Sequence, residues 1–462
     1  MPTIPTSNDL QRLLDEALAE HDAVGAAAGV LVGDEVVTAG AGLANKNTGI
    51  TVTADTLFQI GSTTKIYTAS LVMQLVEEGL VALDTPVAEY LDGASVGNYD
   101  EAREITVRQL LCHTSGMAGD HFADFGRGDD AIERFVDALV DQPRVHSPNE
   151  IMSYCNAGYV VLGRLVELFR KQPWHAAVTE RIAQPLGLVN TVSLPEDAIL
   201  RRAAVGHMPD PQDAEAPASV APVWSLTPAM GPAGALTCAT PADLLAFARM
   251  HLDQGKAPDG SQVLTRSSVK AMREMQVKLP SRATLHAAAW GLGWILFDWE
   301  GARIVGHDGS TLGQGCFLRL VPDQDVAIAI HVNDSRRGAR VVRHVARALF
   351  HDVVGVEIPP EPAVIDDPGD RDLAPVAGTY QQENYDVRVR LVDGQLVVDM
   401  LPTTDHAKQM MAPKHDVPLR PAGGNDYLFD DGSGPTAVAF AAFDGDGRPK
   451  FLHMGFRALP RA

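Results

Sequence analysis

The hydrophobic pattern of the chain is helical over most of its length but begins and ends with strand-like runs. After a helical stretch at residues 8–21, alternating runs at 26–32 and 35–41 flank the turn Gly33-Asp34, which is typical of a hairpin. Strand-like runs return at residues 290–332 and precede a last helix at about 338–352. We therefore expect an α/β fold in which both ends of this segment complete one antiparallel sheet, flanked by helices as a sandwich.

Between these ends, apolar residues recur at spacings of three and four, which predicts helices. The expected helices lie near residues 62–78, 84–91, 106–111, 130–141, 156–171, 174–184, 240–253 and 266–275, and the expected later strands are 290–298, 303–306, 316–321 and 326–332. Residues 209–232 are rich in Pro and Ala and have weak periodicity. A loop of that length in a compact domain is usually a lid or a binding wall.

The chain changes character after a Pro- and Asp-rich segment at residues 358–372, which we interpret as a linker. Beyond it, short strand-like runs are separated by Gly and Asp turns, with Asp393-Gly394 as the strongest hairpin signal. We therefore predict a catalytic domain at residues 1–357 and a small antiparallel β-barrel at residues 373–462.

Composition and charge narrow the function. The 462 residues are 45% hydrophobic and 21% charged, as in a soluble globular protein, and the formal net charge is −21. Such a charge repels phosphate backbones and anionic lipid surfaces, so we expect neither a nucleic-acid nor a membrane partner. No segment approaches the length of a membrane span, and no signal peptide is evident. The four cysteines lack metal-type pairing, and we expect a cytoplasmic protein.

Candidate chemistry begins at Ser62 and Lys65, three residues apart at the start of a predicted helix. Residues at this spacing share a helix face, so the lysine Nζ can reach the serine Oγ. A helix start favours negative charge on the seryl oxygen, and a partly desolvated lysine has a lowered pKa and becomes a base. Alone, the pattern also fits an ordinary helix start with a solvated lysine.

Two further motifs supply context. Tyr154 and Asn156 lie just before a predicted helix, where a phenol can act as a base or proton shuttle and a carboxamide can hold a lysine. His307 and Gly309 lie at a strand end, where the glycine allows a substrate to bind as an extra strand and the histidine can donate a hydrogen bond or proton. The backbone N–H groups of Ser62 and Ser310 would then form an oxyanion hole.

Taken together, Ser-x-x-Lys, Tyr-x-Asn and His-x-Gly resemble the motifs of the serine β-lactamase and penicillin-binding-protein superfamily. The branch of class C β-lactamases, esterases and D-aminopeptidases is the most similar. The resemblance covers roughly residues 10–355 and includes the stretches at 110–116 and 232–236. It implies a β-lactamase-like fold with Ser62, Lys65, Tyr154, Asn156 and His307 as catalytic residues. This chain has His307-Asp308-Gly309 where true β-lactamases have Lys-Thr-Gly, and the missing cation argues against strong lactamase activity.

The C-terminal barrel resembles the lipocalin-like appendage of D-aminopeptidases and of standalone penicillin-binding-protein-type thioesterases. The resemblance implies a serine hydrolase or acyltransferase acting through acyl-Ser62 on esters, thioesters or amides. One alternative is a peptidyl thioesterase or cyclase that releases a nonribosomal peptide with a D-residue. Its partner would be a small-molecule or peptidyl acyl substrate, or a thioester bound to a carrier protein. The other is a general carboxylesterase, D-amino acid amidase or aminopeptidase. A β-lactamase and a non-catalytic sensor on the same fold rank lower.

By analogy with the site walls of the family, we expect Gly309 and four side chains to contact substrate: His121, Phe122, Trp224 and Met230. We expect no metal or organic cofactor. The histidines are scattered, and the nearest approach to a ligand pair in the sequence is His121 with Asp124, which we interpret as a loop contact.

Overall fold

The computed structural model describes residues 2–209, 217–365, 372–410, 412–430 and 435–462. Its larger body is built on an antiparallel sheet of nine strands in the order β3-β2-β1-β13-β12-β11-β10-β9-β8. The strands, in chain order, are β1 (Gly25–Val32), β2 (Glu35–Asn45), β3 (Ile50–Thr51), β8 (Val277–Lys278), β9 (Ala287–Trp290), β10 (Ile295–Trp299), β11 (Ala302–Ser310), β12 (Gly315–Val321) and β13 (Val326–Val332). The hairpin β1–β2 pairs with β13, which confirms that both ends of the segment complete one sheet.

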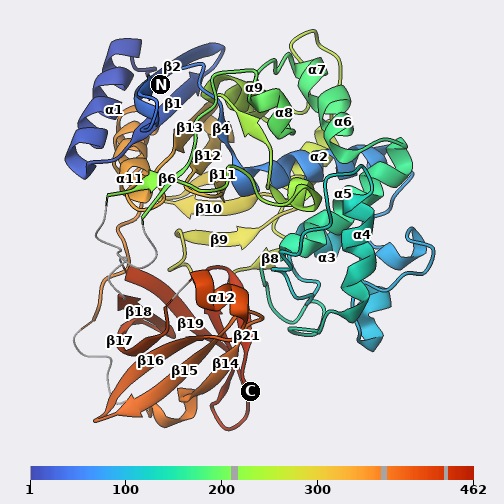
Figure 1. Cartoon of the computed structure of the whole chain (residues 1–462), viewed down its shortest axis with the longest axis vertical. Coiled ribbons are helices and arrows are strands. Elements are labelled where there is room, and N and C mark those ends of the chain that lie inside the picture. Colours follow the sequence, from blue (N-terminus) through green and yellow to red (C-terminus); the bar gives the residue numbers. More distant parts are fainter. Residues whose placement is uncertain (1, 210–216, 366–371, 411, 431–434) are drawn as a thin grey trace.

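Helices cover both faces of this sheet (Figure 1). One core contains α2 (Thr64–Glu77), α5 (Asn156–Arg170) and α9 (Pro241–Leu252), and a second core contains α1 (Ser7–His21) and α11 (Gly338–Leu349). The other helices are α3 (Val107–Leu111), α4 (Ala131–Ala138), α6 (Trp174–Val178), α7 (Gln184–Leu186), α8 (Pro195–Ala198), α10 (Arg266–Met272) and α12 (Asp405–Met410). Within the described residues, no helix combines the length and the apolar character that crossing a bilayer requires, and the cytoplasmic location stays a prediction.

Two short strand pairs lie outside the large sheet. β4 (Phe58–Gln59) pairs with β7 (Cys238–Ala239), and β5 (His207–Met208) pairs with β6 (Ser219–Val220). The β4–β7 pair joins the residues just before Ser62 to the residues that follow the 228–237 segment. A further hydrogen bond from Ile60 N–H to Thr237 O (2.9 Å) extends this contact.

The C-terminal body is an eight-stranded antiparallel sheet in sequential order, which confirms the predicted small barrel. Its strands are β14 (Gly378–Gln381), β15 (Tyr385–Val392), β16 (Gln395–Pro402), β17 (Lys414–Gly423), β18 (Asp426–Asp430), β19 (Pro435–Phe443), β20 (Pro449–Met454) and β21 (Arg457–Pro460). The first and last strands meet where Ala462 N–H donates to Thr379 O (2.9 Å), so the barrel is nearly closed. The exact domain boundaries stay a prediction, and part of them lies outside the described residues.

Two strand predictions need correction. Residues 290–298 are not one strand: β9 ends at Trp290 and β10 begins at Ile295, with a turn in which Gly291 N–H donates to Trp294 O (2.8 Å). Gly293 in that turn has φ +92° and a Cβ there would lie 2.7 Å from Ala69 Cβ, so only glycine fits against α2. β11 is also longer than predicted, which places His307 and Gly309 inside a strand.

Buried histidines make stability depend on pH. Burial lowers the pKa of His331 to about 3 and that of His453 to about 4, whereas the unfolded chain protonates histidine near pH 6.5. Below that pH the unfolded state therefore binds protons that the folded state excludes, and stability falls.

We expect the free energy of unfolding, measured by urea titration, to drop between about pH 7 and about pH 5, by up to about 1.4 kcal/mol per pH unit for each such histidine. His331→Leu removes one titrating group from the core and should flatten this dependence. An unchanged pH dependence in the His331→Leu variant would contradict the assignment.

Candidate active site

Ser62 lies in the short 3-10 helix η1 (Gly61–Thr63), one residue before Thr63, the N-cap of α2. The turn packs against the end of strand β11, because Gly61 has φ +51° and a Cβ there would lie 2.5 Å from Ser310 N. A larger residue at position 61 would push the strand away. The local backbone thus places the serine between the start of α2 and β11.

Lys65 is fully buried on the first turn of α2. Its Nζ contacts three oxygens: Asn156 Oδ1 at 2.7 Å, Ala233 O at 2.6 Å and Ser62 Oγ at 3.2 Å. Burial lowers the pKa of Lys65 well below its ordinary value, and the nearby Arg457 guanidinium lowers it further. The lysine is therefore disposed to be a neutral amine.

A neutral amine has two N–H donors and one lone pair, which match the three contacts of Lys65. The two carbonyl-type oxygens, of Asn156 and Ala233, can only accept, so they take the two N–H groups. The remaining lone pair then accepts the Ser62 O–H. In this arrangement the lone pair of a neutral Lys65 points toward the Ser62 hydroxyl.

Tyr154 lies beside this pair. Lys65 Nζ is 4.7 Å from the centroid of the tyrosine ring, and Tyr154 N–H donates to Phe456 O (2.7 Å). Burial raises the pKa of Tyr154, and the neighbouring Ser62 hydroxyl offsets only part of the shift. The tyrosine therefore stays a phenol, which favours the proton-shuttle alternative over a phenolate base.

The 110–116 stretch supports Tyr154 from behind. His113 has φ +60°, and its ring centroid lies 4.4 Å from that of Tyr154. Its Nδ1 accepts the Cys155 N–H (3.0 Å), and burial lowers the pKa of His113 well below its ordinary value. A neutral histidine in this position fixes the backbone that leads into Asn156 and α5.

His307 faces Ser62 from strand β11. Its Nδ1–H donates to Asp308 O (2.6 Å), and its buried Nε2 has no hydrogen-bond partner. Burial, the largest cause, lowers the pKa of His307 to about 3. With Nδ1–H donating to Asp308 O, the neutral imidazole has an acceptor at Nε2, and proton transfer by His307 stays a prediction.

The backbone around Ser62 packs closely against the end of strand β11. A Cβ on Gly309 would lie 3.0 Å from Ser62 N and 1.8 Å from Ile60 O, so the small residue at 309 allows this approach. That the N–H groups of Ser62 and Ser310 bind an oxyanion stays a prediction.

A residue that sequence reasoning missed, Arg457, reaches the site from the barrel. It follows the turn between β20 and β21 and donates from Nη2 to Asp120 Oδ1 (2.9 Å). Asn156 Nδ2 donates to the same Asp120 oxygen (2.9 Å), so one chain of contacts joins the barrel to Lys65. Burial alone would raise the pKa of Asp120, but the arginine more than compensates and holds it below its ordinary value. No sequence signal connects Arg457 with the earlier motifs.

Together these residues line a pocket of about 350 Å³. Of the predicted contact residues, Phe122, Met230 and Gly309 line it; its other apolar walls are Leu226, Leu285, Trp290, Ile295 and Phe456. Trp224 and His121 are not among the residues that line this pocket. The Trp224 Nε1–H donates to Ala204 O (3.1 Å). His121 packs against Phe125 and Phe135 instead.

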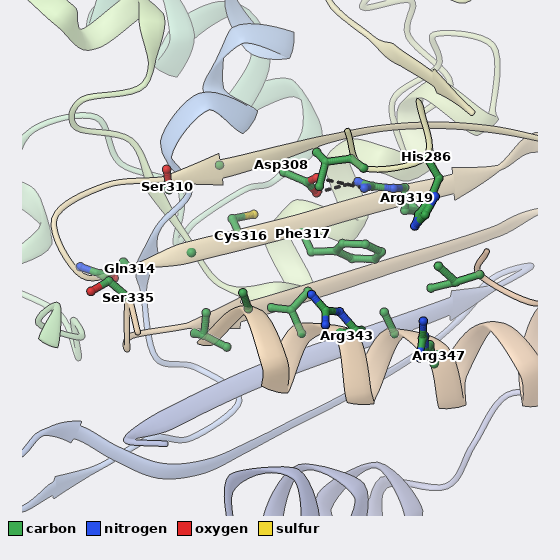
Figure 2. A pocket seen from close by; sticks show the side chains of 18 of the residues that line it. His286, Asp308, Ser310, Gln314, Cys316, Phe317, Arg319, Ser335, Arg343 and Arg347 are labelled. Atoms are coloured by element: carbon green, nitrogen blue, oxygen red, sulfur yellow. Dashed lines mark hydrogen bonds and ion pairs between the residues drawn. The ribbon is translucent and has the colours of Figure 1, made fainter. Parts of the chain in front are cut away.

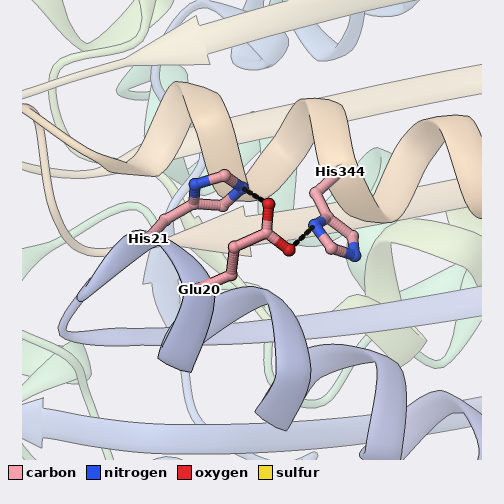
Figure 3. A group of neighbouring side chains, drawn as sticks. All are labelled: Glu20, His21 and His344. Carbon is pink, nitrogen blue, oxygen red and sulfur yellow. Dashed lines mark ion pairs between the residues drawn. The ribbon is translucent and has the colours of Figure 1, made fainter.

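Residues that could hold a metal lie elsewhere. In the described part of the chain, Glu20, His21 and His344 bring three ligand atoms within 4.8 Å of one another, where α1 meets α11 (Figure 3). These helices belong to the core on the other side of the sheet from α2, so this group cannot act on Ser62. Asp124, which the sequence suggested as a partner of His121, accepts the Gly126 N–H (2.9 Å) within its own loop.

Comparisons with known proteins agree with this geometry. The Beta-lactamase family model matches residues 10–351. Penicillin-binding protein 4 of Amycolatopsis lactamdurans is 41% identical over 374 residues, which are 81% of this chain and 97% of that protein. The crystal structure of SurE superposes with a TM-score of 0.79 at 27% identity over 99% of both chains, and SurE also has a structure with D-Leu. The D-stereospecific amidohydrolase from Streptomyces sp. has a TM-score of 0.58 at 26% identity, covering 76% of this chain and 99% of its own.

The charges of Arg457 and Asp120 have opposite effects on the pKa of Lys65. Arg457 lowers the pKa of Lys65 and Asp120 raises it, both after the larger effect of burial. Arg457→Met should therefore move the acidic limb of kcat/KM to higher pH, because the neutral amine forms later. Asp120→Asn should move it to lower pH.

The measurement is the pH–rate profile of an activated ester with each variant. The control is Arg448→Met, in the same barrel, where the guanidinium pairs with Asp446 at 3.6 Å. A shift in the same direction for both site variants would refute the proposed electrostatic coupling.

Proposed function

The chain belongs to the beta-lactamase family and is a serine hydrolase, and from that premise we propose that it is a peptidyl thioesterase that releases its product by cyclisation. In this proposal Ser62 takes a peptidyl group from a thioester, and the amine at the other end of the peptide displaces the serine. The acyl donor is a small-molecule or carrier-protein-bound thioester whose last residue has the D configuration.

The observation that carries the proposal is the charge of the pocket. Among the described residues that line it, His307 is held neutral by burial, and the Arg457 guanidinium is paired with Asp120. A fixed, unpaired cation for a substrate carboxylate is thus missing from these walls. An uncharged acyl derivative, such as a thioester, ester or amide, fits this pocket better than a lactam bearing a carboxylate.

The pocket walls favour a large apolar acyl group. The side chains of Phe122, Leu226, Met230, Trp290 and Phe456 surround the polar atoms near Ser62. Pockets of this type use apolar walls for affinity and a few polar groups for orientation. Water is a weaker competitor for an acyl-enzyme in such surroundings, which favours transfer to a tethered amine.

The contacts around Ser62 support the following proton transfers. The lone pair of neutral Lys65 takes the Ser62 proton as Oγ attacks the thioester carbon, and the C–S bond breaks as the thiol leaves with a proton from the lysine or Tyr154. In the second step the peptide amine attacks the ester carbon, the C–O bond breaks, and Ser62 Oγ regains the amine proton through the same groups. His307 Nε2, an acceptor, is placed to hold the N–H of the incoming amine or of the substrate backbone.

Names of related proteins support the D configuration. SurE has been solved with D-Leu, and the Streptomyces enzyme is a D-stereospecific amidohydrolase. The second candidate function is a general esterase or D-amino acid amidase, which the same Ser62 chemistry serves when water is the acceptor. An esterase, EstB of Burkholderia gladioli, is 35% identical over 194 residues, which are 39% of this chain and 49% of that protein.

The first test uses a pair of peptidyl N-acetylcysteamine thioesters that differ only in a terminal D-Leu or L-Leu. We expect a cyclic product, lighter by one water than the linear acid, from the D-form only, and none with Ser62→Ala. A matched Ser70→Ala variant changes a buried hydroxyl that donates to Ile66 O within α2 and should keep activity. Linear acid as the sole product, from both forms, would reject cyclisation and favour the esterase alternative.

A second prediction concerns His307. Removing its acceptor with His307→Ala should lower turnover by roughly two orders of magnitude, the usual scale for one positioned group, while Ser62 is still labelled by a fluorophosphonate. His307→Gln retains a neutral acceptor and should retain more activity. Because the pKa of His307 is about 3, its protonation should cause no change in rate between about pH 5 and about pH 8. Wild-type turnover by His307→Ala would show that the role of the 306–310 segment is misassigned.

A further inference from the structure

A second cavity of about 340 Å³ lies on the other side of strand β11 from Ser62. It is bounded by β11 and β12 on one side and by helix α11 on the other (Figure 2). Its inner walls are formed largely by the apolar side chains Trp299, Phe317, Val342, Ala346 and Ile358. This volume is within the range of small-molecule sites. We call this cavity the rear chamber.

The inner wall of the rear chamber contains one ion pair. At its inner wall, Arg319 donates to both carboxylate oxygens of Asp308 (2.7 and 3.0 Å). The guanidinium also lies between the rings of Phe297 and Phe317, at 4.1 and 4.2 Å. The two charges neutralise each other, so this pair offers no net charge to a ligand.

The mouth of the chamber, in contrast, has an excess of positive charge. Arg343 and Arg347 are one turn apart on α11 and line the chamber (Figure 2). Arg343 forms an ion pair with Glu361 (3.0 Å) in which both side chains are roughly half exposed, and such pairs are weak. In the described residues, no carboxylate lies within 4 Å of Arg347 in an ion pair. One cation at the mouth is therefore available to an anionic group.

Strand β11 lies between the rear chamber and Ser62. Successive residues of a strand point to opposite faces, so His307 and Gly309 face Ser62 whereas Asp308 and Ser310 point toward the rear chamber. The segment that follows α11 forms a further wall of the chamber through Ile358, Pro359 and Glu361. A separate small molecule with an apolar chain and one anionic end matches the shape and the charge.

We propose that the rear chamber binds a medium-chain carboxylate, with its chain between β11–β12 and α11 and its carboxylate at Arg343 and Arg347, and that this ligand raises the turnover of Ser62. The physical link is the backbone of β11. Asp308, Gly309 and Ser310 line both the rear chamber and the catalytic pocket. A ligand that fills the space behind this strand adds packing contacts and holds the Ser310 N–H in place, and preorganised donors of this kind accelerate acyl transfer.

Octanoate is the probe, and binding to the full chain is measured by titration calorimetry without any turnover. We expect one site that accepts octanoate and rejects octylammonium. Arg343→Gln with Arg347→Gln should weaken binding about tenfold or more through loss of charge-assisted hydrogen bonds, without touching the core. Glu361→Gln should strengthen it, because a competing carboxylate is removed, and Arg340→Gln, on the same helix but outside the chamber lining, should have no effect.

Turnover of p-nitrophenyl butyrate tests the second half of the proposal. Saturating octanoate should raise kcat about twofold or more in the wild type and leave it unchanged in Val342→Trp, which fills the chamber. Octanoate affinity that is insensitive to the arginine and Glu361 variants would overturn the site, and purely competitive inhibition would place octanoate in the Ser62 pocket instead. Because any ester that Ser62 hydrolyses serves here, the outcome does not depend on the cyclase proposal.

Discussion

The catalytic site depends on one buried amine. A charged lysine with no carboxylate at hydrogen-bond distance would lose several kcal/mol of hydration in this interior, so burial selects the neutral form of Lys65. The oxygens of Asn156 and Ala233 then accept both of its N–H groups, and the lone pair is left for Ser62. The same burial sets the protonation states of Tyr154 and His307, because it keeps the first as a phenol and the second as a neutral imidazole.

This arrangement draws on both bodies of the chain. The larger body supplies Ser62 and Lys65 from the start of α2 and His307 from β11, and the barrel supplies Phe456 and Arg457. Through Phe456 O and the ion pair with Asp120, the barrel fixes Tyr154 and Asn156. We infer that the barrel helps to fix the positions of the reacting groups. Residues that contact and orient reacting groups can matter as much for activity as those groups themselves.

Much of the fold could be predicted from local signals. The β1–β2 hairpin, the long helices and the closing strands each carry their own periodicity, and three short motifs named candidate residues that the fold brings close together. The features that sequence analysis missed depend on contacts between residues far apart in the chain. The turn between β9 and β10 exists because Gly293 packs on Ala69 of α2, and the contact of Arg457 with Asp120 joins residues from different bodies. Trp224 and His121 were assigned by analogy, but their side chains are held by Ala204 O and by phenylalanine rings.

The most direct test of this account is the titration of Lys65 itself. Lysine labelled with ¹³C at Cε reports the charge of each amine by NMR, and Lys65→Met identifies the signal. The account predicts a resonance that titrates well below the ordinary lysine pKa of about 10.4 and is that of a neutral amine at neutral pH. A Lys65 signal that remains that of an ammonium group up to about pH 10 would contradict it, and the base for Ser62 would have to be another group.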